Sequence, residues 1–479
     1  MTALLALVAL GFYAYSRQAT EGLVVTGLRD LGPGGGAAWG LYIAFDVYFV
    51  GVSFAGITMA ALIRLLQLER LRVVARIAET LTVIALLLAA LSVLPDLGQP
   101  LRGIVNLFRY ARPQSPFFGT FTLVIAGYLF ASLVYLYLDG RQDAALCART
   151  PGPFQWFHRL WAAGYRDTPA ERERHERTSF WLAIAIVPLL VTAHSTLGFV
   201  FGLQVGRPGW FSALQAPAFV ILAGVSGVGL LAVVAALLRT ALGEQERLGP
   251  EIFRWLGTFL MVLIAAYLYF MIVEWLTTMY AGHTQEVRVT LAMLAGRYAW
   301  IYWTSVAALV GAFVVVVLPA LPAPVVAWLP AGLPRLARPL AAAAIVAAGV
   351  LIVQLVPAAH HVGLTLPPPV WTWLPRLLIV LVALVVLSIL PVVRTNVVAG
   401  TTTAGLLVNV AAIGKRYLIV VPSQTHGSLL PYGTGAYAPT WVEYGVILGV
   451  AALGALLFAL FARVFPLLPV ELPGEGRSH

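Results

Sequence analysis

The sequence has 479 residues, of which 60% are apolar and only 10% carry a charge. Soluble globular domains are about 45–50% apolar and about 25% charged, so this composition excludes an ordinary soluble enzyme and fits a helical membrane protein. The net charge of +10 comes from basic residues spread over short loops. Nucleic-acid binding needs basic residues clustered on a solvated face, so a nucleic-acid partner is not expected.

The cysteine and histidine content limits the metal chemistry of the chain. Cys147 is the single cysteine, which excludes an internal disulfide framework, a thiolate zinc site and a self-contained iron–sulfur cluster. Of the eight histidines, only His194 falls well within an apolar run, so no pair of axial ligands for a membrane haem is present. We therefore predict no haem and no iron–sulfur cluster in this chain.

Apolar runs of about 20 residues, the length that crosses about 30 Å of hydrocarbon, define the predicted elements. A shorter run at residues 1–15 is either an eleventh span or an interfacial helix, and it lacks the features of a removable signal peptide. We predict an all-α, polytopic transmembrane helix bundle. Its ten long runs are 39–66, 75–95, 116–138, 178–204, 211–240, 251–281, 297–320, 336–359, 370–393 and 441–466.

These runs suggest three regions. An N-terminal apolar segment and a glycine-rich linker occupy residues 1–38, and a short tail occupies 467–479. The transmembrane domain between them, residues 39–466, is predicted as two bundles and a final span. The bundles are placed at about 39–240 and 251–393, and the final span at 441–466. Residues 394–440 are interpreted as a long apolar loop, with 405–414 in the interface or re-entrant.

The distribution of basic residues predicts the orientation. Loops that follow odd-numbered spans hold 19 Lys and Arg residues, whereas loops that follow even-numbered spans hold six. Because cytoplasmic loops carry the excess of Lys and Arg, we place the odd loops in the cytoplasm. The first long span then begins on the outer side, and the last one is predicted to run outward.

Ionisable residues within the spans are the candidate functional groups, since each costs about 2.5–3.5 kcal/mol at the membrane centre. They are Asp46, Glu79, Asp96, His194 and Glu274. All except Glu79 are expected in the outer half, where we predict that they gather around a shared pocket. Quinol oxidation releases two protons, and histidine or carboxylate side chains can accept them. Such a cluster is therefore typical of a quinol site.

Each of these residues also has a structural interpretation. A histidine within a span often makes an interhelical hydrogen bond, and Asp46 would reach the headgroups if its span is tilted. Asp96 precedes a turn signal, and Glu274 is followed by Trp275 and two threonines, which are typical of an interface anchor. The hypothesis of a site therefore depends on the cluster rather than on any single member.

Several motifs, in order along residues 39–466, resemble the membrane subunit of the polysulfide reductase (NrfD-type) family, closest to its long ten-helix members of alternative complex III and hydrogenase-linked quinone reductases. The matching stretches are Trp39-Gly40-Leu41-Tyr42, Gly51 to Gly56, Arg76-Ile77-Ala78-Glu79, Ala193-His194-Ser195, Arg207-Pro208-Gly209-Trp210, Tyr267-Leu268-Tyr269, Glu274-Trp275, Gly296-Arg297-Tyr298, Arg394-Thr395-Asn396 and Pro439-Thr440-Trp441.

This resemblance implies a cofactor-free subunit of a respiratory oxidoreductase in a bacterial or archaeal cytoplasmic membrane. It would bind menaquinone or ubiquinone as substrate near the outer face and exchange electrons with a periplasmic ferredoxin-like iron–sulfur subunit. Molybdopterin or cytochrome subunits often complete such complexes. The candidate quinone-binding residues are Asp46, Asp96, Thr120, His194, Ser195 and Glu274, and the candidate proton-path residues are Glu79, Tyr267 and Tyr269.

The sequence departs from the family where quinol ligands are expected. Asp96 stands where the family has histidine, and Gly119-Thr120 stands where it has Trp-Asp. Either the site is rebuilt around Asp46, His194 and Glu274, or quinol binding is weakened or lost. A cofactor-free anchor or a proton-conducting subunit is the alternative function. A secondary transporter fits the composition, but repeated halves and broken helices are not evident.

Overall fold

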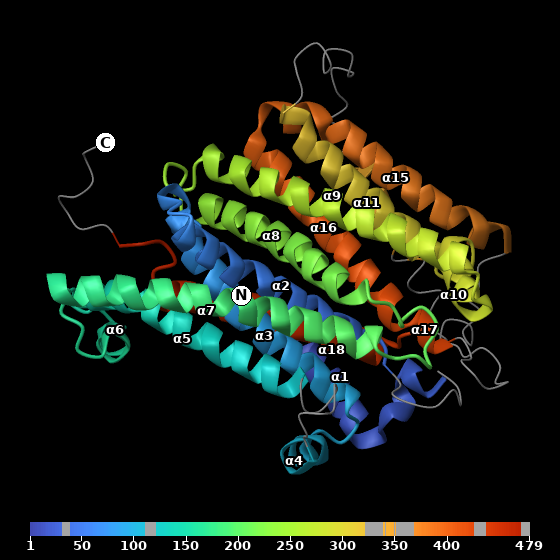
Figure 1. The fold of residues 1–479 in the computed structure, drawn as a ribbon, viewed down its shortest axis with the longest axis horizontal. Coiled ribbons are helices and arrows are strands. Elements are labelled where there is room, and N and C mark those ends of the chain that lie inside the picture. Colours follow the sequence, from blue (N-terminus) through green and yellow to red (C-terminus); the bar gives the residue numbers. More distant parts are fainter. Residues whose placement is uncertain are drawn as a thin grey trace.

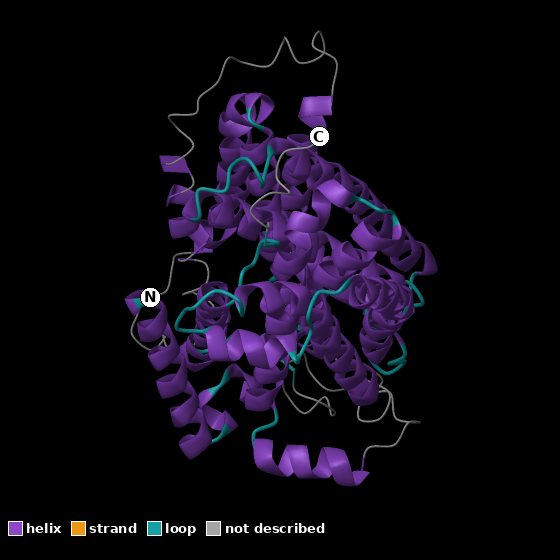
Figure 2. Ribbon diagram, turned by 90° about the vertical axis from the view of Figure 1, so that its left-hand side faces the viewer, coloured by secondary structure: helices purple, strands orange, loops and turns teal. Residues whose placement is uncertain are grey.

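The computed structural model describes residues 1–30, 39–110, 121–320, 339–340, 342–348, 350, 368–425 and 437–470. Its long helices lie side by side in a bundle (Figure 1), and the described residues form helices and connecting loops without a strand (Figure 2). The helices are α1 (Thr2–Glu21), α2 (Leu41–Leu65), α3 (Arg72–Asp96), α4 (Pro100–Tyr110), α5 (Phe121–Cys147), α6 (Gln155–Ala162), α7 (Pro169–Gly202), α8 (Gln215–Ala241), α9 (Pro250–Ala281), α10 (Thr284–Leu294), α11 (Ala299–Val317), α15 (Pro368–Thr395), α16 (Val397–Val420), α17 (Pro422–Thr425) and α18 (Trp441–Val464).

Eight helical stretches in the described part are long and apolar enough to cross a membrane: α2, α3 with the turn before it, α7, α8, α9, α11, α16 with α17, and α18. Seven of them coincide with predicted runs. The runs at 116–138 and 370–393 correspond to α5 and α15, and the run at 336–359 lies largely outside the described residues. The predicted all-α membrane bundle is confirmed.

The region interpreted as a loop after the ninth span is instead a membrane-length helix, and that interpretation is wrong. Residues Val397–Thr425 form an apolar candidate span. Its polar side chains find partners inside the bundle: Thr401 Oγ1 donates to the carbonyl of Phe253 at 3.0 Å, and Asn409 Nδ2 donates to Gly405 at 2.7 Å. Internal hydrogen bonds of this kind allow polar residues within a membrane helix.

The additional span reverses the direction predicted for the last one. Beyond α18, Val470 donates its N–H to Asp143 at 3.1 Å, and Arg247 donates to the carbonyl of Pro469 at 2.6 Å. The end of α18 therefore lies with the arginine-rich loop of residues 148–168, which we call the inner end. The opposite end, with residues 22–30 and Tyr437, is the outer end.

The N-terminal helix lies along a membrane span rather than across its end. A Cβ atom built on Gly11 of α1 would lie 2.6 Å from the Cα of Gly449 in α18. Glycine permits this close approach of two helices. With 20 residues, α1 is about 30 Å long at 1.5 Å per residue. Gly11 lies against Gly449 and Ala14 against Gly445, so α1 runs antiparallel to α18. Helix α1 is not among the eight candidate spans of the described residues, and the eleventh-span interpretation of residues 1–15 stays a prediction.

Helix α2 occupies the centre of the bundle, with 89% of its apolar window buried. It packs closely against α3 and α8 through small residues. A Cβ atom on Gly56 would lie 1.8 Å from Thr82 Oγ1 of α3, and one on Gly227 of α8 would lie 2.5 Å from the Cβ of Ala55. This close packing fixes the depth and rotation of α2, and so positions Asp46 in its first turns.

Candidate functional site

Two of the predicted site residues lie close together at the outer end. Asp46 in α2 is 5% exposed, and its carboxylate is near enough to that of Asp96, the last residue of α3, for the two to interact electrostatically. The Oδ1 atom of Asp96 is buried and has no hydrogen-bond partner among the described residues. Thr120, the third residue predicted at this end, lies outside the described residues.

Two neutral polar side chains lie next to Asp96, which also interacts electrostatically with Glu443. Gln18 of α1 is buried, and its Nε2 donates to the carbonyl of Pro95 at 2.6 Å. The hydroxyl of Tyr42 donates to Gln18 Oε1 at 2.5 Å. These bonds connect the outer ends of α1, α2 and α3 directly beside Asp96. Within the described ion pairs, no cation is bound to Asp46 or Asp96.

A third acid at this end, Glu443 of α18, accepts hydrogen bonds that join α18 to neighbouring segments. Its Oε2 accepts the N–H groups of Gly27 at 2.8 Å and of Thr440 at 2.9 Å, the second as part of a capping box. Its Oε1 accepts the hydroxyl of Tyr437, whose oxygen in turn accepts the N–H of Leu41 at 2.6 Å. Burial raises the pKa of Tyr437 well above its ordinary value, so this hydroxyl stays protonated.

A hollow of about 350 Å³ lies at the outer end between α1 and the turn that joins α3 to α4. Asp96 immediately precedes this turn. The volume falls within the range of about 300–1,000 Å³ that is typical of small-molecule sites. The lining combines apolar and aromatic surface with a few polar groups; its residues are Tyr15, Gln18, Ala19, Gly98, Gln99, Pro100, Leu101 and Arg102.

His194 has different surroundings. It is 1% exposed, with Nδ1 2.9 Å from the carbonyl of Leu190 in its own helix and Nε2 2.9 Å from the carbonyl of Val50 in α2. Its ring makes an edge-to-face contact with Phe54. Both nitrogens therefore contact backbone oxygens, and neither His194 nor Ser195, which is half-buried beside it on α7, lines the outer hollow.

Glu274 also lies elsewhere, on α9. It is half-buried and close enough to Tyr267 and Tyr302 to interact with them electrostatically. Tyr267 is buried, whereas Tyr269 is 64% exposed on the outer surface of the same helix. The four residues expected around one pocket thus occupy three surroundings, and none of the four lines the hollow; Asp96 immediately precedes the turn that does.

Glu79 belongs to a cluster at the inner end. Arg76 forms ion pairs with Asp143 and with Asp139, the latter at 3.3 Å, and Arg64 forms an ion pair with Asp139. Glu79 is 1% exposed and interacts electrostatically with this group. Both of its carboxylate oxygens nevertheless lack a hydrogen-bond partner in the part of the chain that the structure describes, as does the hydroxyl of Tyr135.

Arg416 is a buried cation in a stretch that the hydropathy pattern assigned to a loop. In α16 it is 1% exposed, its Cζ lies 4.3 Å from the centre of the Phe219 ring, and its Nη2 donates to the carbonyl of Phe219 at 3.3 Å. Its Nη1 has no partner among the described residues. It faces Gly51 of α2, which leaves space for the guanidinium. In the sequence, the length of this segment and its small residues at 405 and 414 were the features that could have indicated a packed membrane helix around Arg416.

Comparison with known proteins identifies the fold family. The family model described as "Polysulphide reductase, NrfD" matches residues 32–362. A putative membrane subunit of dimethyl sulfoxide reductase from Halobacterium salinarum is 33% identical over 311 residues, which cover 63% of this chain and 65% of the relative.

Two further relatives are similar over the same extent. A selenate reductase subunit of Mesobacillus selenatarsenatis is 26% identical over 59% of this chain and 66% of the relative. The Hdr-like menaquinol oxidoreductase integral membrane subunit of Archaeoglobus fulgidus is 27% identical over 63% of this chain and 66% of the relative. The chain thus spans just under two thirds of the length of these curated relatives.

Proposed function

Because the chain belongs to the NrfD polysulphide reductase family, we propose that this multi-pass membrane protein is the integral membrane subunit of a respiratory oxidoreductase and exchanges electrons and protons with quinol at its outer end. The names of its relatives support this proposal: they are a putative membrane subunit of a dimethyl sulfoxide reductase, a subunit of a selenate reductase, and an integral membrane subunit of a menaquinol oxidoreductase. The last of these relatives favours menaquinol as the quinol.

The hollow beside Asp96 is the observation that carries the proposal. It has the size of a small-molecule site. Leu101, Pro100 and Tyr15 offer apolar surface to a quinone ring, while Gln18 and Gln99 offer hydrogen bonds to its oxygens. Aspartate in place of the family's histidine keeps a proton acceptor at this position.

The chemistry assigns distinct tasks to the two acids. Oxidation of a quinol to a quinone releases two electrons and two protons. Asp96 precedes the turn that lines the hollow, and its buried Oδ1 has no hydrogen-bond partner among the described residues; we assign it the first proton of the quinol and the adjacent Asp46 the second. A single cysteine cannot hold an iron–sulfur cluster, so the electrons pass to a separate iron–sulfur subunit at the outer face. Molybdopterin or cytochrome subunits are further expected partners.

The remaining quinone-site assignments stay predictions. The structure does not describe Thr120, and His194, Ser195 and Glu274 do not line the hollow. A quinone contact at these residues would need a second site or a ring that extends beyond the hollow. We therefore base the test on Asp96 and on the hollow itself.

The test uses the intact complex in its native membranes, with turnover measured against the concentration of a soluble menaquinol analogue. Asp96→Asn should lower kcat by about 10²–10⁴-fold with little change in KM, because it removes a proton acceptor and keeps the shape. Ala19→Phe should fill the hollow and raise KM. Thr20→Phe is the matched control, since Thr20 is exposed and does not line the hollow. Unchanged kinetics in both Asp96→Asn and Ala19→Phe would refute the proposed site.

A proton-conducting role is the second candidate, and Glu79 favours it. A carboxylate buried in a span with two unpartnered oxygens is typical of a proton relay. Glu79→Gln should preserve quinol-dependent electron transfer but lower the number of protons moved per electron in proteoliposomes. Glu69→Gln, an exposed acid before the same helix, is the control. An unchanged proton-to-electron ratio in Glu79→Gln would exclude this path.

A further inference from the structure

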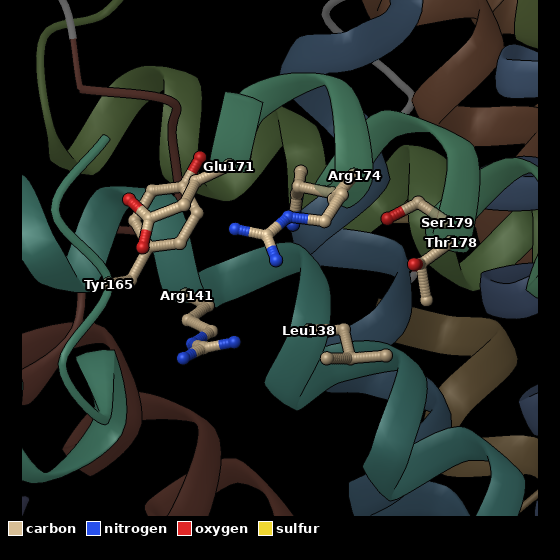
Figure 3. A pocket seen from close by; sticks show the side chains of 8 residues that line it. Leu138, Arg141, Tyr165, Glu171, Arg174, Thr178 and Ser179 are labelled. Carbon is tan, nitrogen blue, oxygen red and sulfur yellow. The ribbon is translucent and has the colours of Figure 1, made fainter. Parts of the chain in front are cut away.

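A second hollow, of about 320 Å³, lies at the inner end between α5, the loop before α7 and the first turns of α7. Figure 3 shows that the guanidinium groups of Arg141 on α5 and Arg174 on α7 reach into this same space, with Tyr165 and Glu171 at one side and Thr178 and Ser179 at the other. Leu138 and His175 complete the lining. We call this hollow the inner basic pocket.

One wall of the inner basic pocket is built and fixed. Arg141 donates from Nε to the carbonyl of Ala162 at 2.8 Å and from Nη2 to that of Ala163 at 3.0 Å. Its Cζ lies 5.5 Å from the centre of the Tyr165 ring. Tyr165 and Ser179 are both buried. The guanidinium is thus held in place by two bonds, and its Nη1 has no acceptor within the described residues.

Arg174 provides the second cation. Its Nε donates to the carbonyl of Ala170 at 3.3 Å, and neither Nη atom has an acceptor in the described part of the chain. Glu171 is the acid in the lining, but its Oε2 accepts the N–H groups of Arg166 at 3.0 Å and of Thr168 at 3.2 Å in the capping box of α7. Glu171 also interacts electrostatically with Arg174, but two guanidinium groups against one carboxylate leave the pocket with a net positive charge and with unused donors.

Of the other acids near the pocket, Glu176 acts electrostatically on His175, and two more are bound to different cations. Asp167 accepts from Arg172 at 2.9 Å, and Asp139, which acts electrostatically on His175, forms ion pairs with Arg64 and Arg76. They do not neutralise Arg141 and Arg174. Two guanidinium groups with nearby hydroxyls of Tyr165, Thr178 and Ser179 suit the oxygens of a phosphate group.

The depth of the pocket indicates the source of the phosphate. Trp181 follows two residues after Ser179 on α7 and is exposed, as are Trp156 and Leu160 on the short amphipathic helix α6. Exposed tryptophans next to arginines are typical of the membrane–water interface. We propose that the inner basic pocket binds the phosphate of an anionic phospholipid from the inner leaflet, as basic pockets between membrane helices can.

Lipid binding to the purified complex in neutral detergent tests this proposal. Phosphatidylglycerol should be retained in native mass spectra and should raise the midpoint of thermal unfolding, whereas phosphatidylcholine should not. Arg174→Gln should weaken phosphatidylglycerol binding about tenfold through loss of a charge-assisted hydrogen bond. Arg177→Gln is the matched control, because Arg177 is exposed one turn later in α7 and does not line the pocket.

Two further arms make the outcome decisive. Arg174→Glu should abolish the effect of phosphatidylglycerol on the unfolding midpoint. The test changes Arg174 rather than Arg141, because Arg141 also holds the loop before α7 in place. Inorganic phosphate is the probe for a soluble source: if phosphate alone stabilises the complex in an Arg174-dependent way and phosphatidylglycerol does not, the lipid assignment is overturned. Equal phosphatidylglycerol binding by Arg174→Glu and Arg177→Gln would overturn the site as a whole.

Discussion

The buried aspartates at the two ends of the bundle differ in their partners. At the inner end, Asp139 and Asp143 form ion pairs with Arg64 and Arg76. At the outer end, Asp46 and Asp96 interact with each other without a described ion pair to a cation, and Asp96 immediately precedes the turn that lines the outer hollow. The first arrangement joins helices, whereas the second leaves proton acceptors available. The same residue type therefore has a structural role at one end and, in the proposed function, a chemical role at the other.

Glu79 and Glu443 show that position alone does not decide the role. Glu79 lies among the paired charges of the inner end but has two unpartnered oxygens among the described residues. Glu443 lies at the outer end, yet it accepts hydrogen bonds from Gly27, Tyr437 and Thr440. In the proposed roles, the number of hydrogen bonds that a carboxylate accepts, rather than its depth in the membrane, distinguishes the structural Glu443 from the proton-relay candidate Glu79.

The largest expected effect comes from breaking the inner ion pairs. Arg76→Gln should destabilise the protein by about 3–5 kcal/mol, because it leaves Asp143 buried without its cation. The measurement is the midpoint of thermal unfolding in detergent, together with the yield of assembled complex. Asp96→Asn is the comparison from the outer end, and it should leave the midpoint nearly unchanged. Similar losses in the two variants would remove the distinction between the ends.

A smaller effect is expected from Glu443, the structural acid of the outer end. Glu443→Gln should cost about 1–3 kcal/mol, since it weakens charge-assisted hydrogen bonds to two backbone N–H groups. Hydrogen exchange at the Gly27 amide should become faster, because its N–H would then donate to a neutral amide instead of a charged carboxylate. Tyr437→Phe, which removes one of the bonds to Glu443, should give a smaller change. An unaltered exchange rate at Gly27 in Glu443→Gln would contradict the structural role.

The sequence predicted the spans well where hydropathy is continuous. The run at 251–281 matches Pro250–Ala281, and 39–66 contains Leu41–Leu65. It failed at Val397–Thr425 because Thr401, Asn409 and Arg416 interrupt the apolar pattern. The carbonyls of Phe253, Gly405 and Phe219 that accept their hydrogen bonds are supplied by the folded bundle, and hydropathy does not report such contacts.

The candidate site was predictable in depth but not in rotation about each helix axis. Counting residues along a span indicates how deep a side chain lies, and it placed Asp46 and Asp96 at the outer end. The direction in which a side chain points depends on which neighbouring helix packs there. His194 consequently contacts the backbone of α2 at Val50, and Tyr269 faces outward from α9. Gln18, which lines the hollow, was missed because α1 was not assigned to the bundle.

The smallest expected effect on stability is that of Arg72→Gln, which removes an exposed charge at the inner end and so separates the effect of charge from that of burial. Arg72 lies one turn before Arg76 in α3 and forms an ion pair with Glu69 at 2.8 Å, but both side chains are about 60% exposed. Exposed pairs contribute about 0–1 kcal/mol, so Arg72→Gln should shift the thermal midpoint far less than Arg76→Gln. The two changes remove the same group from adjacent turns of one helix. If Arg72→Gln were as destabilising as Arg76→Gln, the arginines of the inner end would act through their net charge rather than through buried ion pairs.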